Sequence, residues 1–171
     1  MFCFRSALVI FFTLCYFSAT AQDPIDFSFT DSKGKQSSLF QILDSGNHVI
    51  LDFFFADCAP CKKLTPSMAK LDSTYKSEGK KVTVLGISDR DEDKVLHQFD
   101  STYNVDYQSV GIDGGGDVIT GLYKAQFNFV GWPTYAVICS DKRIFWDLER
   151  KVGFEEVQSF VDTCRLTTDV P

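Results

Sequence analysis

Histidine is scarce in this chain, and its scarcity limits the metal chemistry that the protein can perform. His48 and His97 are the only histidines among 171 residues, and neither stands at a paired metal-ligand spacing. A zinc site needs four ligands, and a copper site built on two cysteines needs a third ligand that is usually histidine. Both kinds of site are therefore disfavoured, and we expect no metal and no other cofactor.

Positive charge is also in short supply. Lysine and arginine number 17 against 23 aspartates and glutamates, so the net charge is −6. This balance disfavours nucleic acid and anionic membranes as partners. Three consecutive glycines, Gly114 to Gly116, are not followed by the Lys-Ser/Thr of a phosphate loop, and acids flank them. We expect residues 113–117 to form a flexible loop that binds no phosphate.

Cysteines are too few for a disulfide-stapled scaffold. The N-terminal segment carries one positive charge at Arg5, an apolar run over 6–17 and the small-x-small pattern Ala19-Thr20-Ala21. This pattern predicts a signal peptide over residues 1–21, cleaved after Ala21, since the run is shorter than the roughly 20 residues that span a bilayer. An uncleaved anchor is the alternative. Export would place the protein in an oxidising compartment, where disulfides persist.

Hydrophobic patterning predicts a single α/β domain over residues 22–171. The run 48–55 is apolar except for His48 and Asp52, which indicates a central strand covered on both faces. We expect a hairpin within 23–37, a helical turn over 38–43, an extended piece over 107–112, further strands over 80–87, 133–139 and 143–148, and helices over 60–76, 92–103, 118–127 and 154–166. The domain needs a hydrophobic core, because only four of the six cysteines follow the predicted signal peptide, and four cannot hold 150 residues together.

The pair Cys58-Ala59-Pro60-Cys61 carries the chemistry. It lies between the predicted central strand and a predicted helix, where unpaired N–H groups and the helix dipole favour a thiolate. Cys58 at the helix start is expected to be the exposed nucleophile, and Cys61, one turn further on, the buried resolving thiol. The sequence therefore predicts thiol–disulfide exchange.

Residues around this motif make it more specific. Asp52 lies six residues before Cys58 in the predicted strand, Pro66 lies inside the following helix, where it should cause a bend, and Trp132-Pro133-Thr134 opens a later strand. Over residues 47–166 this set resembles the thioredoxin superfamily, and in particular its TlpA/ResA-like extracytoplasmic members. The resemblance implies a thioredoxin fold: a central mixed β-sheet flanked by helices on both faces, with an N-terminal β-hairpin.

The resemblance also implies roles for individual residues. Asp52 becomes a buried acid beneath the dithiol, which could accept the Cys61 proton; burial should raise its pKa, whereas a solvated aspartate at the strand edge is the alternative. Pro133 becomes a cis-proline whose loop binds the partner, and Trp132 offers a stacking surface or packs into the core. Asp89 is similar to an acidic residue near the dithiol in the ResA branch, whereas a solvated turn over residues 88–91 is the alternative.

Two residues depart from the family pattern: Asp57, and the large aromatic Trp132 directly before the proline. Asp57 stands where the family usually has tryptophan, and its carboxylate should raise the pKa of Cys58, against the opposite effect of Lys62 and Lys63. The two remaining cysteines, Cys139 and Cys164, are expected toward the same end of the sheet. Separate buried thiols are the default expectation, and a disulfide between them is the alternative.

The resemblance implies an exported reductase of protein disulfides in the periplasm or cell envelope of a bacterium. Apocytochromes are one substrate class that it implies, and a membrane thiol carrier would supply the electrons. Two alternatives stay open. A peroxiredoxin-like peroxide reductase would need Thr-x-x-Cys, and Phe55 occupies the threonine position. A redox-inert binding module with the same fold is kept open by Asp57 and Trp132.

Overall fold

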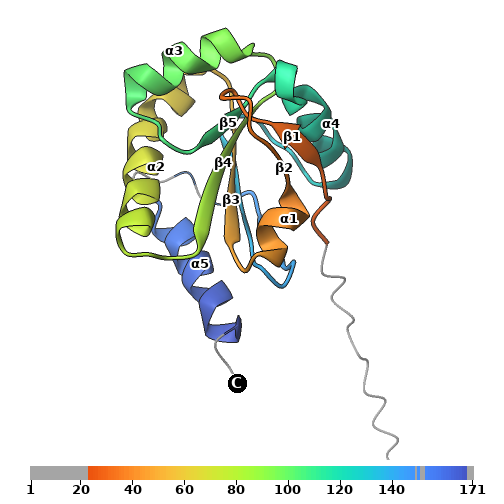
Figure 1. Ribbon diagram of the computed structural model, residues 1–171, viewed down its shortest axis with the longest axis vertical. Coiled ribbons are helices and arrows are strands. Elements are labelled where there is room, and N and C mark those ends of the chain that lie inside the picture. Colours follow the sequence, from red (N-terminus) through yellow and green to blue (C-terminus); the bar gives the residue numbers. More distant parts are fainter. Residues whose placement is uncertain (1–22, 149, 151–152, 169–171) are drawn as a thin grey trace, which may run out of the picture.

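A five-stranded mixed sheet forms the centre of the molecule (Figure 1). This computed structural model describes residues 23–148, 150 and 153–168, so the predicted signal peptide lies outside the described residues. The strand order is β5-β4-β3-β6-β7, with β3 parallel to β4, β4 parallel to β5, and β6 antiparallel to β3 and β7. The strands are β3 (His48–Phe54), β4 (Val82–Ser88), β5 (Gln108–Val110), β6 (Thr134–Ile138) and β7 (Ile144–Trp146).

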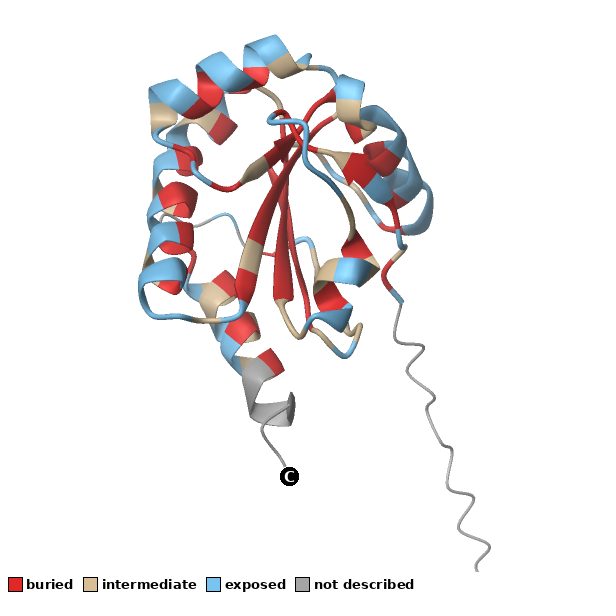
Figure 2. Ribbon diagram, in the orientation of Figure 1, coloured by how far each residue is buried: buried red, intermediate tan, exposed pale blue. Residues whose placement is uncertain are grey.

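Helices cover both faces of this sheet, as the sequence predicts. α2 (Ala59–Ser77) and α5 (Glu155–Thr168) lie on one face, whereas α1 (Leu39–Asp44) and α4 (Gly116–Gln126) lie on the other. Side chains of β3 alternate between the two cores: Ile50 packs on the α2 side, and Val49 and Leu51 pack on the opposite side. Figure 2 shows the consequence, a fully buried β3 between helices that expose only their outer surfaces.

The predicted N-terminal hairpin is also present. β1 (Ser28–Thr30) pairs antiparallel with β2 (Gln36–Ser38) as a separate two-stranded sheet. Phe27 and Phe29 pack into the core on the α4 side, and the Ser38 hydroxyl caps α1 by accepting a hydrogen bond from the Gln41 N–H at 3.2 Å. α2 runs without interruption through Pro66. These contacts confirm the thioredoxin-fold prediction.

The glycine-rich segment differs from its prediction. Residues Ile112–Gly114 form a 3₁₀ turn, and Gly116 is the first residue of α4, so the expected flexible loop was wrong. A Cβ atom at Gly116 would collide with the carbonyl oxygen of Ser88, at the end of β4. The glycine is therefore needed for close packing of the α4 N-terminus against the sheet.

The two distal cysteines form a disulfide. Cys139, directly after β6, and Cys164, on α5, are both fully buried, and their Cα atoms lie 5.2 Å apart. The default expectation of separate thiols was wrong. The reason is that α5 packs directly on the face of β6, which brings the two side chains together.

We expect the double variant Cys139→Ala/Cys164→Ala to lose about 3 kcal/mol of unfolding free energy, because the disulfide closes a loop with a sequence separation of 25. Denaturant unfolding of wild type and variant, both with the Cys58–Cys61 pair oxidised, measures this difference. Insulin reduction should persist in the variant. A difference below about 1 kcal/mol would contradict a structural role for the bond.

Candidate redox site

The CxxC motif lies at the N-terminus of α2. Cys58 is the N-cap residue, and its sulfur accepts a hydrogen bond from the backbone N–H of Cys61 at 3.2 Å. Pro60 occupies the first turn, where its missing N–H costs nothing. Cys58 and Cys61 form a disulfide, with Cα atoms 5.2 Å apart. After reduction, the same N–H and the helix dipole would stabilise a thiolate at Cys58.

Both sulfur-bearing residues are buried. Cys58 is 4% exposed and Cys61 is 1% exposed, so the expectation of an exposed Cys58 was wrong, although it keeps more exposure than its partner. The cause is a small apolar cluster in which both cysteines pack with Phe54, from β3, and with Leu96 and Phe99, from α3 (Asp93–Tyr103). A protein partner must therefore bring its own disulfide into close contact with this surface.

Asp57 is exposed and is paired with a lysine of the same loop–helix junction. Lys62 Nζ donates to the Asp57 carboxylate at 2.7 Å. This hydrogen bond and the positive charge of Lys62 lower the pKa of Asp57. Because the two charges compensate each other, Asp57 opposes a Cys58 thiolate less than its position in the sequence implies.

Asp52 is a buried acid in the middle of the sheet. It is 2% exposed between Gly86 on β4 and Tyr135 on β6, so the alternative of a solvated residue at the strand edge was wrong. Tyr107 donates its hydroxyl to Asp52 Oδ2 at 3.4 Å, and Oδ1 has no hydrogen-bond partner among the residues that the structure describes. Burial raises the pKa of Asp52 to about 7, against a smaller opposite effect of the Tyr107 hydrogen bond.

The strand register places this acid on the dithiol side of the sheet. Alternation along β3 directs Asp52 to the same face as Ile50 and Phe54, the face that α2 covers. Phe54, two residues further along, packs against Cys58 and Cys61. Asp52 therefore lies on the face of the sheet that α2 covers, two residues before a side chain of the cluster that holds the dithiol.

The loop before β6 lies next to the cluster that holds the two cysteines. The Trp132–Pro133 peptide bond is cis, and Trp132 packs against the cluster that holds the two cysteines. A groove of about 330 Å³ begins beside this loop. It is lined by Pro60, Lys63, Leu64, Trp132, Pro133 and Arg150.

A second cavity, of about 380 Å³, flanks the site on the α3 side, and its lining includes Asp91, a residue that sequence reasoning missed. Asp91 Oδ2 accepts hydrogen bonds from the Ala56 N–H and the Ser88 hydroxyl, both at 2.6 Å. It thereby fixes the segment before Cys58 to the end of β4. The Ser-x-x-Asp spacing of Ser88 and Asp91 is the signal for this turn, although the partner at Ala56 is visible only in three dimensions.

Asp89 has a different environment from Asp91. Its carboxylate accepts from Arg90 Nε at 2.9 Å and from Lys124 Nζ at 3.1 Å. Both cations lie over the Trp132 ring. Asp89, which we expected near the dithiol, is therefore linked to the site through these two cations and the Trp132 ring.

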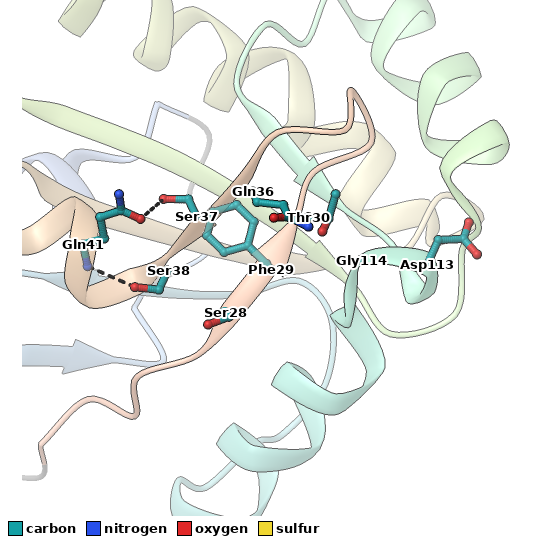
Figure 3. Close-up of a pocket in the computed structure, with 9 residues that line it drawn as sticks. All are labelled: Ser28, Phe29, Thr30, Gln36, Ser37, Ser38, Gln41, Asp113 and Gly114. Carbon is teal, nitrogen blue, oxygen red and sulfur yellow. Dashed lines mark hydrogen bonds between the residues drawn. The ribbon is translucent and has the colours of Figure 1, made fainter.

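Another cavity, of about 520 Å³, lies between the N-terminal hairpin and the 3₁₀ turn (Figure 3). It is polar, and in it the Ser37 hydroxyl donates to Gln41 Oε1 at 3.5 Å. None of the predicted site residues lines this cavity. Within residues 23–148, 150 and 153–168, no group of three or more His, Cys, Asp or Glu side chains is placed to hold a metal ion. We assign the chemistry to the Cys58–Cys61 pair, which forms a disulfide at the start of α2.

Comparison with known proteins agrees with this geometry. The AhpC/TSA family model matches residues 20–146. The chain belongs to the AhpC/TSA family. The thiol-disulfide oxidoreductase ResA of Bacillus thuringiensis subsp. konkukian is 28% identical over 136 residues, which cover 80% of this chain and 73% of ResA. The thioredoxin-like protein YneN of Bacillus subtilis is 29% identical over 127 residues, covering 74% of this chain and 69% of YneN.

A solved structure supports the fold of this family member. The thioredoxin domain of a thiol-disulfide oxidoreductase from Bacteroides vulgatus superposes with a TM-score of 0.66 at 24% identity, covering 84% of this chain and 98% of that domain. With the CxxC pair at disulfide distance, this AhpC/TSA family member is a thiol–disulfide oxidoreductase. In the part of the chain that the structure describes, no helix has the length and apolar character needed to cross a bilayer.

Proposed function

We propose that this oxidoreductase works as a reductase of protein disulfides, with Cys58 as the attacking thiol and Cys61 as the resolving thiol. The observation that carries the proposal is the position of the dithiol: it lies at the N-terminus of α2, above the buried Asp52 carboxyl whose pKa is about 7. The helix terminus favours a thiolate at Cys58, and the carboxyl provides a proton acceptor for Cys61.

The reaction begins with the reduced dithiol. The Cys58 thiolate attacks one sulfur of the partner disulfide, forming a mixed disulfide and releasing the other partner sulfur as a thiolate. Cys61 then passes its proton to Asp52 and attacks the Cys58 sulfur, which releases the second partner thiolate. Two electrons have moved from the dithiol to the partner, and the Cys58–Cys61 disulfide has formed. An external dithiol must return two electrons before the next cycle.

Trp132 and Pro133 are proposed to bind the partner polypeptide. The backbone of the cis-proline loop can pair with an extended segment, as in strand addition to a sheet edge. The groove beside it offers apolar contacts from Pro60, Leu64 and the Trp132 ring. Partner residues next to the target disulfide would therefore lie along α2.

The proposed location is the envelope of a bacterium, outside the cytoplasm. The predicted signal peptide and the similarity to ResA support this location, and apocytochromes are a substrate class that the resemblance implies. A membrane thiol carrier is the proposed electron donor, because an oxidising compartment lacks a soluble pool of reductant.

The test of this function is the equilibrium potential of the Cys58–Cys61 pair in glutathione buffers, measured together with the rate of insulin-disulfide reduction. We expect one two-electron transition between about −220 and −300 mV, the range of cellular reductases. A potential near about −120 mV would reverse the direction to that of an oxidant. The absence of any transition would favour the redox-inert module, and peroxide consumption faster than disulfide exchange would favour the peroxide reductase.

A further inference from the structure

The Trp132 side chain is held on several sides by groups from distant parts of the chain. Phe55 and Phe129 contact its ring with centroids 5.7 and 5.4 Å away, both in T-shaped arrangements. The guanidinium carbon of Arg90 lies 4.6 Å from the ring centroid, and Lys124 Nζ lies 4.3 Å from it. The negative face of the indole ring attracts each of these two cations, but the cations repel each other.

The negative charge of Asp89 offsets the repulsion between Arg90 and Lys124. Its carboxylate accepts from Arg90 Nε at 2.9 Å and from Lys124 Nζ at 3.1 Å, so one negative charge joins both cations. The Asp89 side chain is only 13% exposed. Burial alone would raise its pKa, yet the bonds and charges of Arg90 and Lys124 bring the pKa below its usual value. The carboxylate is therefore ionised at neutral pH.

Three separate segments meet in this arrangement. Asp89 and Arg90 follow β4, Lys124 belongs to α4, and Trp132 lies in the loop before β6. Trp132 immediately precedes Pro133, and both residues line the groove that begins at the first turn of α2. A change in the position of the indole ring would therefore change the shape of the groove.

We infer that Asp89 is a positioning residue: through Arg90 and Lys124 it fixes the Trp132 ring as the wall of the substrate groove beside the dithiol. This inference rests on the proposed function for its kinetic consequence. The Asp89 carboxylate bonds to Arg90 and Lys124, and it acts on the groove through Trp132. Its effect is on the affinity for a protein disulfide, because a mobile indole ring would leave the groove without a fixed wall.

The experiment uses Asp89→Asn in a Trp146→Phe background, in which Trp132 is the only tryptophan. The variant retains a similar shape but cannot neutralise two cations. We expect acrylamide quenching of Trp132 fluorescence to rise about twofold or more, and the KM for insulin to rise about tenfold with kcat within about twofold. The rate at which the reduced dithiol reacts with the small disulfide dithiobis(nitrobenzoate) should stay within about twofold, because that reagent does not need the groove.

Asp117→Asn in the same background is the matched control, because it removes one exposed acid at the start of α4 without touching Trp132. It should leave quenching and KM unchanged. Asp89→Glu should restore most of both, since it keeps the carboxylate. Lys124→Met removes one cation, leaves Asp89 in place and should reproduce the rise in quenching, which provides a second route if Asp89→Asn does not fold.

Three results would overturn the inference. Asp89→Asn could behave like Asp117→Asn in both quenching and KM. It could instead lower kcat and the small-disulfide rate with quenching unchanged, which would mean that Asp89 acts on the sulfurs directly. Unchanged quenching in Lys124→Met is the third. A wild-type protein that fails to reduce insulin would overturn the proposed function. The quenching measurement does not depend on catalysis, so it would still test whether Asp89 fixes the Trp132 ring.

Discussion

Cys61→Ser will accumulate a mixed disulfide with insulin, whereas Cys58→Ser will form none and will reduce insulin no faster than buffer. The two sulfurs differ in position along α2. Cys58 is the N-cap residue, its sulfur accepts the Cys61 N–H, and it keeps the small exposure that the pair has. We therefore expect Cys58 to attack an incoming disulfide and Cys61 to resolve the product.

Non-reducing electrophoresis and intact mass of the trapped complex measure this outcome directly. The gain in mass should equal one insulin molecule, because a single attack opens only one of its disulfides, and thiol reductant should reverse it. Cys139→Ala/Cys164→Ala is the control, because its dithiol is intact and it should turn over without a trapped species. A covalent complex in Cys58→Ser, or full activity in either single variant, would exchange the roles of the two cysteines or remove the dithiol from the mechanism.

The sequence predicted the features of this molecule that depend on local patterns. The apolar run 48–55 contains the fully buried strand β3, and the CxxC pair lies at the N-terminus of α2, as predicted. Trp132-Pro133 was identified as a cis-proline loop through the family resemblance, and the bond is cis. These predictions hold because hydrophobic period, helix capping and a distinctive motif are encoded within short stretches of chain.

The wrong predictions concern contacts between distant segments. The exposure of Cys58 depends on Leu96 and Phe99, which α3 brings over the end of the sheet. The helical start at Gly116 depends on the nearby carbonyl of Ser88, and the Cys139–Cys164 disulfide depends on how α5 packs on β6. Asp91 was missed because its partner at Ala56 is 35 positions away in the sequence. No periodicity reports such contacts, because each is set by tertiary packing.

Asp52→Asn will stabilise the oxidised protein at alkaline pH. The folded-state pKa of Asp52 is about 7, against an ordinary value near 3.8, so the folded protein binds more protons than the unfolded chain between these two values. Stability therefore falls as pH rises through this window, by up to about 4 kcal/mol in total. Asparagine resembles the protonated acid and cannot ionise. The variant should match wild type near pH 4 and exceed it by up to that amount above pH 8.

Denaturant unfolding of the oxidised forms from pH 4 to 9 measures this difference. Burial raises the pKa of Asp100 to about 6, but Asp100 is present in both proteins, so its contribution cancels in the comparison. The difference between the two curves is therefore the contribution of Asp52. Parallel curves would show that Asp52 does not carry a raised pKa, and the proton-transfer role would lose its basis.

The same substitution should slow catalysis, so that stability and activity change in opposite directions. Without a proton acceptor below Cys61, resolution of the mixed disulfide should slow about 100-fold at pH 7, and the rise in rate around pH 7 should disappear. Asp100→Asn is the matched control, since it removes another buried acid of raised pKa and should alter stability while leaving the rate within about twofold. Equal rates in Asp52→Asn and wild type would mean that solvent takes the Cys61 proton. A slower rate together with a gain in stability would show that the Asp52 carboxylate lowers the stability of the fold and accelerates resolution. This is the expected relation between stability and function at an active site.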